Sequence, residues 1–220
     1  RKGEILGIAG LVGAGRTETL RALFGADDAD EKHVKIEGKE YTFNNPSEAI
    51  AAGFVYMTEN RKFDGAALGL SVEENITMAS LQKFSKCGRM QEAKAKSNAQ
   101  EYCKKLNIRT PSIDQKVMNL SGGNQQKVII GKWLTRTAKV MVFDEPTRGI
   151  DVGAKYEIYS LMNDLSDQGI AIIMISSDLP EILGMSDRVA VFKDGRVTAV
   201  LDRKDADSEI IMKYATGKLS

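Results

Sequence analysis

Two adjacent carboxylates, Asp144 and Glu145, follow the apolar run Val140–Phe143, and Pro146 comes next. Four consecutive apolar residues are typical of a strand buried on both faces in a parallel sheet, and the proline ends that strand. Ligands of open α/β sheets bind outside the carboxyl ends of the strands. We therefore expect the two acids to lie where a phosphate ligand and its metal would be held. The alternative is a strand that merely ends in solvated acids.

A glycine-rich loop, Gly10-Leu11-Val12-Gly13-Ala14-Gly15-Arg16-Thr17, follows the apolar run Ile5–Ala9, and apolar residues at helical spacing come after it. Strand, glycine-rich loop and helix form the context of a phosphate-binding loop. Its backbone N–H groups can close around phosphate oxygens, and the helix dipole favours the negative charge. Thr17 can place its hydroxyl on Mg²⁺. The alternative is a tight turn without a ligand.

One position of this loop departs from the phosphate-loop motif, which has lysine where this chain has Arg16. Arginine keeps the positive charge, but its planar fork does not replace a compact ammonium at the β- and γ-phosphates. We expect the nucleotide to bind and the chemistry to suffer.

A second glycine pair lies in Leu120-Ser121-Gly122-Gly123, which opens a helix with an apolar face that includes Val128 and Ile129. Two glycines after a serine cap leave backbone N–H groups exposed for an anion. The alternative is a plain helix cap. The strand that follows and ends in Asp144 and Glu145 argues against this alternative.

The composition fits a soluble globular protein of 220 residues, with 42% hydrophobic and 28% charged residues. A net charge of +1 gives no footprint for nucleic acid. Cys87 and Cys103 lack metal-ligand spacing and fit a reducing compartment. Neither a membrane-spanning run nor a signal peptide is recognisable, so we expect a cytosolic protein that reaches a membrane only through a partner.

The remaining patterns predict a parallel-sheet core interrupted by helices. Residues 71–137 lack a comparable apolar strand and indicate an inserted helical subdomain, with the core in 1–70 and 138–220. Ser71 to Glu74 form a capping box. Further expected elements are a strand pair at a solvated sheet edge in 33–44, a helix from Asn45 to Gly53, a strand at 54–57, a helix through Ile158 and Leu165, a strand at 170–175, a hairpin across Asp194-Gly195, and a helix at 208–216.

Three motifs occur in an order that resembles the nucleotide-binding domain of ABC transporters over essentially the whole chain: the phosphate loop Gly10–Thr17, the signature Leu120-Ser121-Gly122-Gly123-Asn124-Gln125-Gln126, and the strand that ends in Asp144-Glu145. Arg16, Glu59, the string from Asp144 to Ala154, and Ser177 in place of the family's switch histidine narrow the resemblance. The chain looks like the second, C-terminal cassette of the duplicated ATP-binding subunit of bacterial monosaccharide importers of the ribose, galactose and xylose type. The implied fold is α/β: a P-loop NTPase (RecA-like) parallel-sheet core with an inserted ABC-type helical subdomain and a small antiparallel β element.

The resemblance also implies roles for individual residues, with ATP and Mg²⁺ as the bound cofactors. Thr17 and Asp144 would position Mg²⁺, and Glu145 would polarise the attacking water. Glu59 and the loop after it would sense a membrane permease, and Asp151 would lie in the loop crossing a dimer interface. The nucleotide-contacting set implied in this way is Gly10, Gly13, Ala14, Gly15, Arg16, Thr17, Glu59, Ser121, Gly122, Gly123, Asp151 and Ser177.

The implied partners are a second ATP-binding cassette on the same full-length chain, integral membrane permease subunits and, indirectly, a periplasmic or extracellular sugar-binding protein, with no nucleic acid. Such cassettes dimerise head to tail, each ATP lying between one loop and the opposite signature. The location would be cytoplasmic, on the inner face of the cell membrane.

Family members also carry antiparallel strands and an adenine-stacking aromatic before the loop, whereas here the loop begins within ten residues of Arg1. We infer an excised fragment with weak adenine recognition, unless a Tyr or Phe elsewhere supplies the stacking.

Three departures, Arg16, Glu59 and Ser177, fall in the site built around the chain's own phosphate loop, while the signature is intact. Phosphoryl transfer depends almost entirely on positioning and charge stabilisation, so we expect poor hydrolysis there and a signature that completes the partner's site. A non-hydrolysing regulatory module that gates a partner is the competing interpretation.

A third class, the DNA-maintenance ATPases that bear the same signature, does not fit the sequence. Such a protein would need a long heptad coiled coil between the loop and the signature, for which residues 71–137 are too few.

Overall fold

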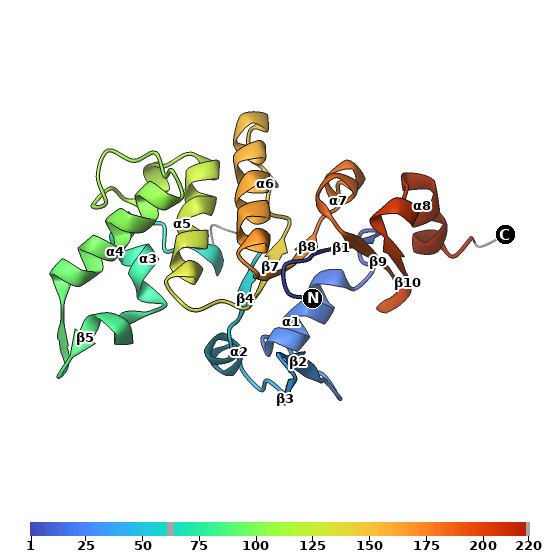
Figure 1. The fold of residues 1–220 in the computed structure, drawn as a ribbon, viewed down its shortest axis with the longest axis horizontal. Coiled ribbons are helices and arrows are strands. Elements are labelled where there is room, and N and C mark those ends of the chain that lie inside the picture. Colours follow the sequence, from blue (N-terminus) through green and yellow to red (C-terminus); the bar gives the residue numbers. More distant parts are fainter. Residues whose placement is uncertain (61–63, 219–220) are drawn as a thin grey trace. The chain divides into compact units, whose positions relative to one another are not determined.

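The computed structural model describes residues 1–60 and 64–218. Its contacts divide the chain into two compact units. The first, called the sheet unit here, comprises Arg1–Tyr56, Lys139–Pro146 and Met162–Ser220. The second, called the helical unit, comprises Met57–Ala138 and Thr147–Leu161. Figure 1 traces the elements of both along the chain.

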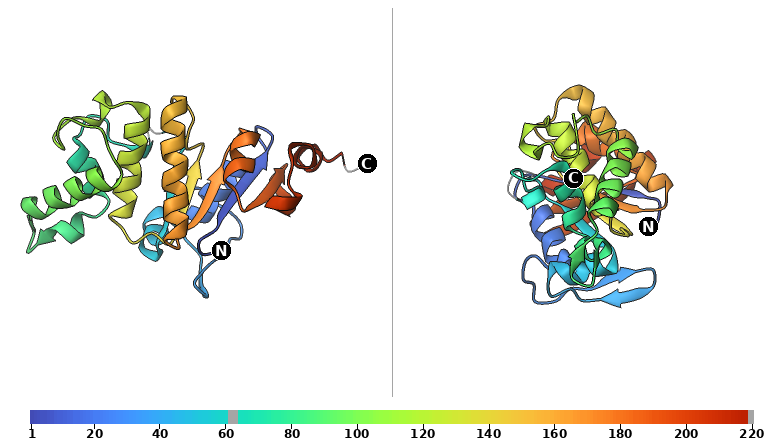
Figure 2. Two further views of the ribbon diagram at one scale, coloured as in Figure 1. Left: turned by 45° about the horizontal axis from the view of Figure 1, so that its top comes forward. Right: turned by 90° about the vertical axis from the view of Figure 1, so that its left-hand side faces the viewer.

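A six-stranded sheet with the order β10-β9-β1-β8-β7-β4 forms the centre of the fold. β1 runs parallel to both β8 and β9, β7 runs parallel to β8, and β10 runs antiparallel to its neighbour β9. The same strands are seen from two other directions in Figure 2. The strands are β1 (Ile5–Gly10), β4 (Phe54–Met57), β7 (Val140–Asp144), β8 (Ala171–Ile175), β9 (Arg188–Lys193) and β10 (Arg196–Asp202).

The register of the sheet brings the expected chemical groups to one edge. Ile175, the last residue of β8, pairs with Ile8 of β1 on one side and with Asp144 of β7 on the other. The carboxyl ends of three parallel strands therefore lie side by side, which is the ligand-binding edge of such a sheet. This confirms the fold class and the strand assignments made from the apolar runs.

The core explains why these strands are central. Met141, Val142 and Phe143 of β7 are fully buried, as expected for a strand covered on both faces. One cluster of the sheet unit packs helix α1 (Arg16–Phe24) and the segment 36–56 against the strands, with Phe24 edge-on to Phe54 and tilted against Tyr56. Such aromatic packing contributes about 0.5–1.5 kcal/mol per pair beyond the buried area.

Four helices belong to the sheet unit alone: α1 (Arg16–Phe24), α2 (Pro46–Ala52), α7 (Leu179–Met185) and α8 (Ser208–Thr216). The start of α2 follows the expected pattern, because the Asn45 side chain accepts from the Glu48 amide. Gly53 ends that helix with a left-handed conformation, again as expected. Helix α7 was not anticipated from the sequence, because its seven residues are too short for a periodic apolar pattern.

The strand pair expected in 33–44 is present as β2 (Val34–Ile36) and β3 (Lys39–Tyr41). Its placement at the edge of the main sheet was wrong, because β2 and β3 form a two-stranded sheet of their own in the described part of the chain. The expected hairpin across Asp194-Gly195 is confirmed as β9–β10. Both turn residues have positive φ, 49° and 74°, as a two-residue turn of this type requires.

The helical unit contains α3 (Val72–Met78), α4 (Glu92–Lys105) and α5 (Gly122–Leu134), with α3 packed against both of the others. The capping box at Ser71 is complete in both directions. Shorter elements here are the 3₁₀ turns η2 (Leu81–Phe84) and η3 (Val117–Asn119) and a small hairpin of β5 (Ser85–Lys86) and β6 (Arg89–Met90). Whether 71–137 acts as a separate subdomain stays a prediction.

Helix α6 (Val152–Asp167) contributes its first ten residues to the helical unit and its last six to the sheet unit. Ile158, Met162 and Leu165 are buried along one face, as their spacing predicts. In the described residues, no helix has both the length and the apolar character needed to cross a membrane. The 3₁₀ turn η4 (Arg203–Asp205) connects β10 to α8.

Candidate functional site

The glycine-rich loop turns sharply between β1 and α1. Gly10 has φ 158°, and a Cβ atom built on it would stand 2.7 Å from the backbone oxygen of Phe192, so any larger residue would force the backbone apart. Gly15, the residue before α1, is left-handed with φ 86°. A Cβ on Gly13 would meet nothing within 4 Å, so the loop is open at that position. A concave loop that leads into a helix N-terminus suits a phosphate group.

Two hydroxyl groups hold the carboxylate of Asp144. Its Oδ2 accepts from the Thr17 hydroxyl at 2.9 Å and from the Tyr56 hydroxyl at 2.5 Å, while its buried Oδ1 has no hydrogen-bond partner among the described residues. Burial raises the pKa of Asp144, and the bonds from Tyr56 and Thr17 act in the opposite direction. Burial, with the nearby negative charge of Asp144, raises the pKa of the Tyr56 hydroxyl, which therefore remains a donor.

Glu145 adopts a left-handed conformation with φ 48°, which is uncommon for a residue other than glycine. Its amide donates to the carbonyl of Ile175 at 2.9 Å, which holds the strained residue at the end of the sheet. The Ser177 hydroxyl donates to Glu145 Oε2 at 3.2 Å. Burial raises the pKa of this carboxyl, and the Ser177 bond partly counteracts that effect. Strain held at one residue in this way is frequent at functional sites.

Arg16, the departure in the loop, lies at the first position of α1 and is 9% exposed. Its Nη1 donates to the backbone carbonyl of Ser176 at 2.7 Å. Ser176 is itself held, because its hydroxyl donates to the buried carboxylate of Glu181. Burial raises the pKa of both Asp144 and Glu145, and the nearby Arg16 charge opposes part of that rise. The guanidinium thus ties the loop helix to the end of β8.

The donor set fits a magnesium ion better than a transition metal. Within residues 1–60 and 64–218, no three His, Cys, Asp or Glu side chains gather into a group that could hold a metal. Mg²⁺ is usually bound by one or two carboxylates together with substrate phosphates and waters. One carboxylate with a partnerless buried oxygen and one adjacent hydroxyl, Asp144 and Thr17, provide such a set beside the loop.

The signature lies in the helical unit at the start of α5. Ser121 occupies the capping position, but its hydroxyl does not cap the helix backbone, which corrects the expectation of a serine cap. Instead, Asn124 Nδ2 donates to Ser121 Oγ at 2.9 Å, and Asn124 Oδ1 accepts from the Arg109 amide at 2.8 Å. A Cβ on Gly123 would stand 2.7 Å from the Cβ of Ala154, so glycine lets the α5 and α6 segments of this unit approach closely.

A cavity of about 280 Å³ opens beside the signature within the helical unit. Asp151 caps α6 there, because its Oδ1 accepts from the Ala154 amide at 3.0 Å. Two cations of the unit, Arg109 and the buried Lys127, both pair with Glu157, at 3.1 and 2.7 Å. The cavity is lined by Arg109, Ser121, Gly123, Asn124, Asp151, Gly153, Ala154 and Glu157. It therefore combines polar side chains with two helix starts.

Glu59 forms an ion pair with Arg148, a contact that the sequence did not suggest. The loop after Glu59 was expected to sense a permease, but residues 61–63 lie outside the described residues. The structure thus assigns Glu59 a partner within the helical unit and leaves its expected role a prediction.

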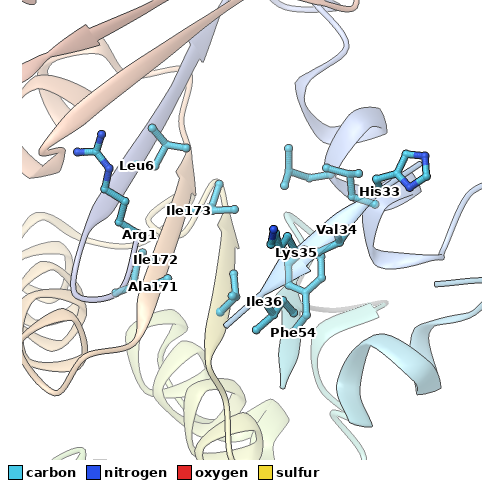
Figure 3. Close-up of a pocket in the computed structure, with 13 residues that line it drawn as sticks. Arg1, Leu6, His33, Val34, Lys35, Ile36, Phe54, Ala171, Ile172 and Ile173 are labelled. Atoms are coloured by element: carbon cyan, nitrogen blue, oxygen red, sulfur yellow. The ribbon is translucent and has the colours of Figure 1, made fainter. Parts of the chain in front are cut away.

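One cavity of the sheet unit lies beside the candidate site, and another lies away from it. One of about 230 Å³ adjoins the loop and is lined by Leu11, Val12, Gly13, Ala14, Lys193, Asp194, Ala215 and Thr216, without an aromatic ring among them. The other, about 300 Å³ and shown in Figure 3, is mostly apolar, with Leu6, Phe54 and Ile173 on its wall. Its lining includes Val140 and Ala171, the first residues of β7 and β8, so it lies at the strand ends opposite Asp144.

The structure thus brings together the loop, Thr17, Asp144, Glu145 and Ser177 in the sheet unit, and Ser121, Gly122, Gly123 and Asp151 in the helical unit. The sequence analysis did not identify Tyr56 as a functional residue, and it named Asn124 as part of the signature without its contacts to Ser121 and Arg109. For Tyr56 there was a hint, because a tyrosine in a buried apolar strand needs a partner for its hydroxyl. For Asn124 the contact with Arg109 depends on a loop fifteen residues away in sequence, which no local pattern shows.

A sequence profile of the family described as "ABC transporter" matches residues 1–148, two thirds of the chain. The chain belongs to the ABC transporter family. Among solved structures, this ABC cassette is similar to a nucleotide-free ATP-binding cassette from an ABC transporter, with a TM-score of 0.81, 24% identity, and 97% and 88% of the two chains covered. A dimeric cassette in a post-hydrolysis state bound to ADP and Pi gives a TM-score of 0.75 at 22% identity, covering 92% and 87%. At these identities, the likeness shows the fold.

The sequence relatives are much closer. The cassette is 55% identical over 218 residues to the "putative ribose/galactose/methyl galactoside import ATP-binding protein 1" of Agrobacterium fabrum, covering 99% of the chain and 43% of that protein. It is 51% identical over 217 residues to the "ribose import ATP-binding protein RbsA" of Oceanobacillus iheyensis, covering 99% and 44%. The chain therefore spans less than half the length of these relatives. The expected resemblance to the ATP-binding subunits of ribose- and galactose-type importers is confirmed.

Proposed function

We propose that this chain is the second, C-terminal ATP-binding cassette of the duplicated ATP-binding subunit of a bacterial monosaccharide importer. It binds Mg-ATP at its own phosphate loop, hydrolyses it weakly, and supplies its signature to the partner cassette. The names of the relatives support sugar import, and their length, more than twice that of the chain, supports a second cassette on the same polypeptide. ATP turnover at the paired sites then drives a monosaccharide through permease subunits.

The proposed roles in the sheet unit follow from the geometry of the loop. Backbone amides from Gly13 to Thr17 hold the phosphates at the start of α1, where the dipole favours anions. Thr17 and Asp144 hold the metal, which neutralises charge on the phosphates when bound. Glu145 orients a water through the carboxylate oxygens beside Ser177. A left-handed backbone at Glu145 supports this role, because the strain is held by the neighbouring strand.

Weak hydrolysis is carried by one observation: the Arg16 guanidinium donates to the Ser176 carbonyl at 2.7 Å. A phosphate-loop lysine acts as a mobile point charge at the β- and γ-phosphates. A buried guanidinium bound to the backbone holds its positive charge at a fixed position. The charge therefore cannot move with the phosphoryl group during transfer, and it stabilises the transition state less. Ser177 also lacks the ring with which the family's histidine reaches the γ-phosphate.

The signature serves the facing cassette in this proposal. Ser121, Gly122 and Gly123 donate to the γ-phosphate of an ATP held by the partner's loop, and Asp151 lies in the segment that crosses the interface. The presence of glycine at position 123, where the backbone passes close to Ala154, supports this role. The permease is contacted through Glu59 and the loop after it, on the cytoplasmic face of the membrane, and a periplasmic or extracellular sugar-binding protein delivers the substrate.

A steady-state ATPase assay tests the proposal. We expect the chain to turn over Mg-ATP slowly and the Arg16→Lys variant to be at least about tenfold faster, because a lysine restores the mobile charge. Arg21→Lys on the same helix is the matched control, since Arg21 pairs with Asp27 and stands outside the glycine-rich loop. Rapid turnover by the unmodified chain, or an unchanged rate in Arg16→Lys, contradicts weak hydrolysis through Arg16.

The second candidate is a regulatory module that binds nucleotide without hydrolysing it. The bond from Ser177 to Glu145 favours it, because it occupies one oxygen of the candidate base. Transport by the complete importer separates the two. Glu145→Gln in this cassette lowers transport if the site hydrolyses ATP during the cycle, and leaves transport unchanged if the cassette only gates its partner.

A further inference from the structure

The hydroxyl of Tyr56 makes the shortest contact that Asp144 receives. Tyr56 lies in β4, is 4% exposed, and donates to Asp144 Oδ2 at 2.5 Å across 88 positions of sequence. A hydrogen bond to a charged acceptor is about twice as strong as one between neutral groups. No motif that points to ATP binding in this chain includes this tyrosine.

Two donors converge on one oxygen of Asp144, and the other oxygen is left over. Oδ2 accepts from Thr17 and Tyr56, whereas Oδ1 is buried and has no hydrogen-bond partner within residues 1–60 and 64–218. A buried carboxylate oxygen without a partner costs about 1–3 kcal/mol, so its retention calls for an explanation. The arrangement fixes the carboxylate by Oδ2 and keeps Oδ1 for a cation.

The two donors differ in what a metal would do to them. Thr17 is itself a candidate metal ligand, so its hydroxyl oxygen would turn to the ion. Tyr56 is anchored by its ring, which packs against Phe24 with 5.6 Å between the ring centres inside the core cluster of the sheet unit. Its hydroxyl therefore stays with Oδ2 whether or not a metal is bound.

We propose that Tyr56 is a positioning residue of the magnesium site, which holds Asp144 so that Oδ1 faces the metal. This inference rests on the proposed function, because it takes Asp144 as the metal ligand. Partners behind a metal ligand fix its orientation, and losing one typically costs about 10–100-fold in metal affinity. A purely structural tyrosine would instead change the stability of the fold and leave the metal affinity alone.

The test is a titration of the full chain with Mn²⁺ in place of Mg²⁺, in the presence of a non-hydrolysable ATP analogue, with unbound Mn²⁺ followed by electron paramagnetic resonance. We expect the Kd for Mn²⁺ to rise about 10-fold or more in Tyr56→Phe. Binding of the same analogue in EDTA should be unchanged. A Kd within twofold of the unmodified chain overturns the proposal.

Two further variants sharpen the result. Tyr41→Phe is the matched control, because Tyr41 stacks on Phe43 in the same unit, whereas the hydroxyl groups that bind Asp144 among the described residues are those of Thr17 and Tyr56. The Kd of this variant for Mn²⁺ should not change. In an Asp144→Asn background, Tyr56→Phe should have no further effect on Mn²⁺ binding, because its partner carboxylate is gone. Additive losses in the double variant overturn the proposed route through Asp144.

A measurement without any substitution covers the case in which Tyr56→Phe does not fold. The chain has six tyrosines, and fluorotyrosine labelling gives each a ¹⁹F resonance. We expect the Tyr56 resonance to shift when Mg²⁺ is added to the chain with the ATP analogue, and an unmoved resonance overturns the proposal. An unmodified chain that binds no Mn²⁺ with nucleotide overturns the proposed function as well, whereas normal binding with an unaffected Tyr56→Phe overturns this inference alone.

Discussion

The phosphate-loop region of the sheet unit and the signature region of the helical unit are both built at the start of a helix, but they use their cations differently. At the phosphate loop, the cation Arg16 belongs to the motif itself and is bound to a backbone carbonyl. At the signature, Arg109 and Lys127 stand outside the motif and pair with Glu157. The first region has therefore changed the group that would act on phosphate, and the second has kept its own donors.

This difference leads us to propose that the cassette keeps its nucleotide-binding geometry while its own hydrolysis is weak. The glycines, Thr17 and Asp144 form the arrangement that we propose for phosphate and metal binding, and Arg16 is the position at which the loop departs from the motif. In the signature region, Ser121 is oriented by Asn124 and Gly123 lies close to Ala154. The predictions below compare the two regions directly.

The largest expected effect is on hydrolysis in the complete importer. Ser121→Ala removes the hydroxyl that we propose as a donor to the partner's ATP and should lower the assembly's ATPase rate about 100-fold or more, in line with the loss of other transition-state donors. Arg16→Ala should lower it less than about threefold, because little turnover depends on this loop. Ser97→Ala on the exposed face of α4 is the control. The reverse order of the two effects would break the comparison.

The glycines of the two regions should differ in their effect on stability. Gly10→Ala places a methyl 2.7 Å from a backbone oxygen that cannot move away, and should lower the free energy of unfolding by about 2–4 kcal/mol. Gly123→Ala meets the Ala154 methyl and should cost about 1–3 kcal/mol. Urea titrations measure both. Gly184→Ala is the control, because a Cβ at this position meets nothing within 4 Å, and it should not destabilise the fold. A loss of stability in this control would contradict the steric explanation.

A pH titration tests the anchoring of the signature helix. Lys132 of α5 is buried, and burial lowers its pKa from 10.5 to about 8. Between these values, the unfolded chain binds more protons than the folded one, so stability rises with pH. From pH 7 to pH 10, the unmodified chain should gain about 1–3 kcal/mol of unfolding free energy relative to Lys132→Met. A constant difference between the two would show that Lys132 titrates normally in the fold.

The smallest effect concerns the amide that orients the signature serine. Asn124→Ala removes the bonds to Ser121 and to the Arg109 amide and should lower the free energy of unfolding by about 1 kcal/mol, because the site is solvated. Asn163→Ala on the exposed face of α6 is the control and should be neutral. If the two variants have the same melting temperature, the Asn124 amide does not hold the serine in place.

Much of the fold was predictable because its causes are local. The apolar run ending at Asp144, the hairpin turn at Asp194-Gly195 and the caps at Asn45 and Ser71 all follow from short-range patterns, and each is confirmed. The placement of the strand pair β2–β3 at the edge of the main sheet was wrong, since pairing partners depend on distant segments. Helix α7 was missed because seven residues give too little periodicity.

The sequence by itself determined which groups the site contains: the glycine loop, Arg16 in place of lysine, the acids at the end of β7 and the signature. Only the tertiary structure decided what these groups do to one another. It bound Arg16 to the carbonyl that follows β8, set Tyr56 behind Asp144, and joined Asn124 to Ser121 and Arg109. The physical reason is that motif spacing is written along the chain, whereas hydrogen-bond partners of buried groups are chosen by the packing of strands and helices that are far apart in sequence.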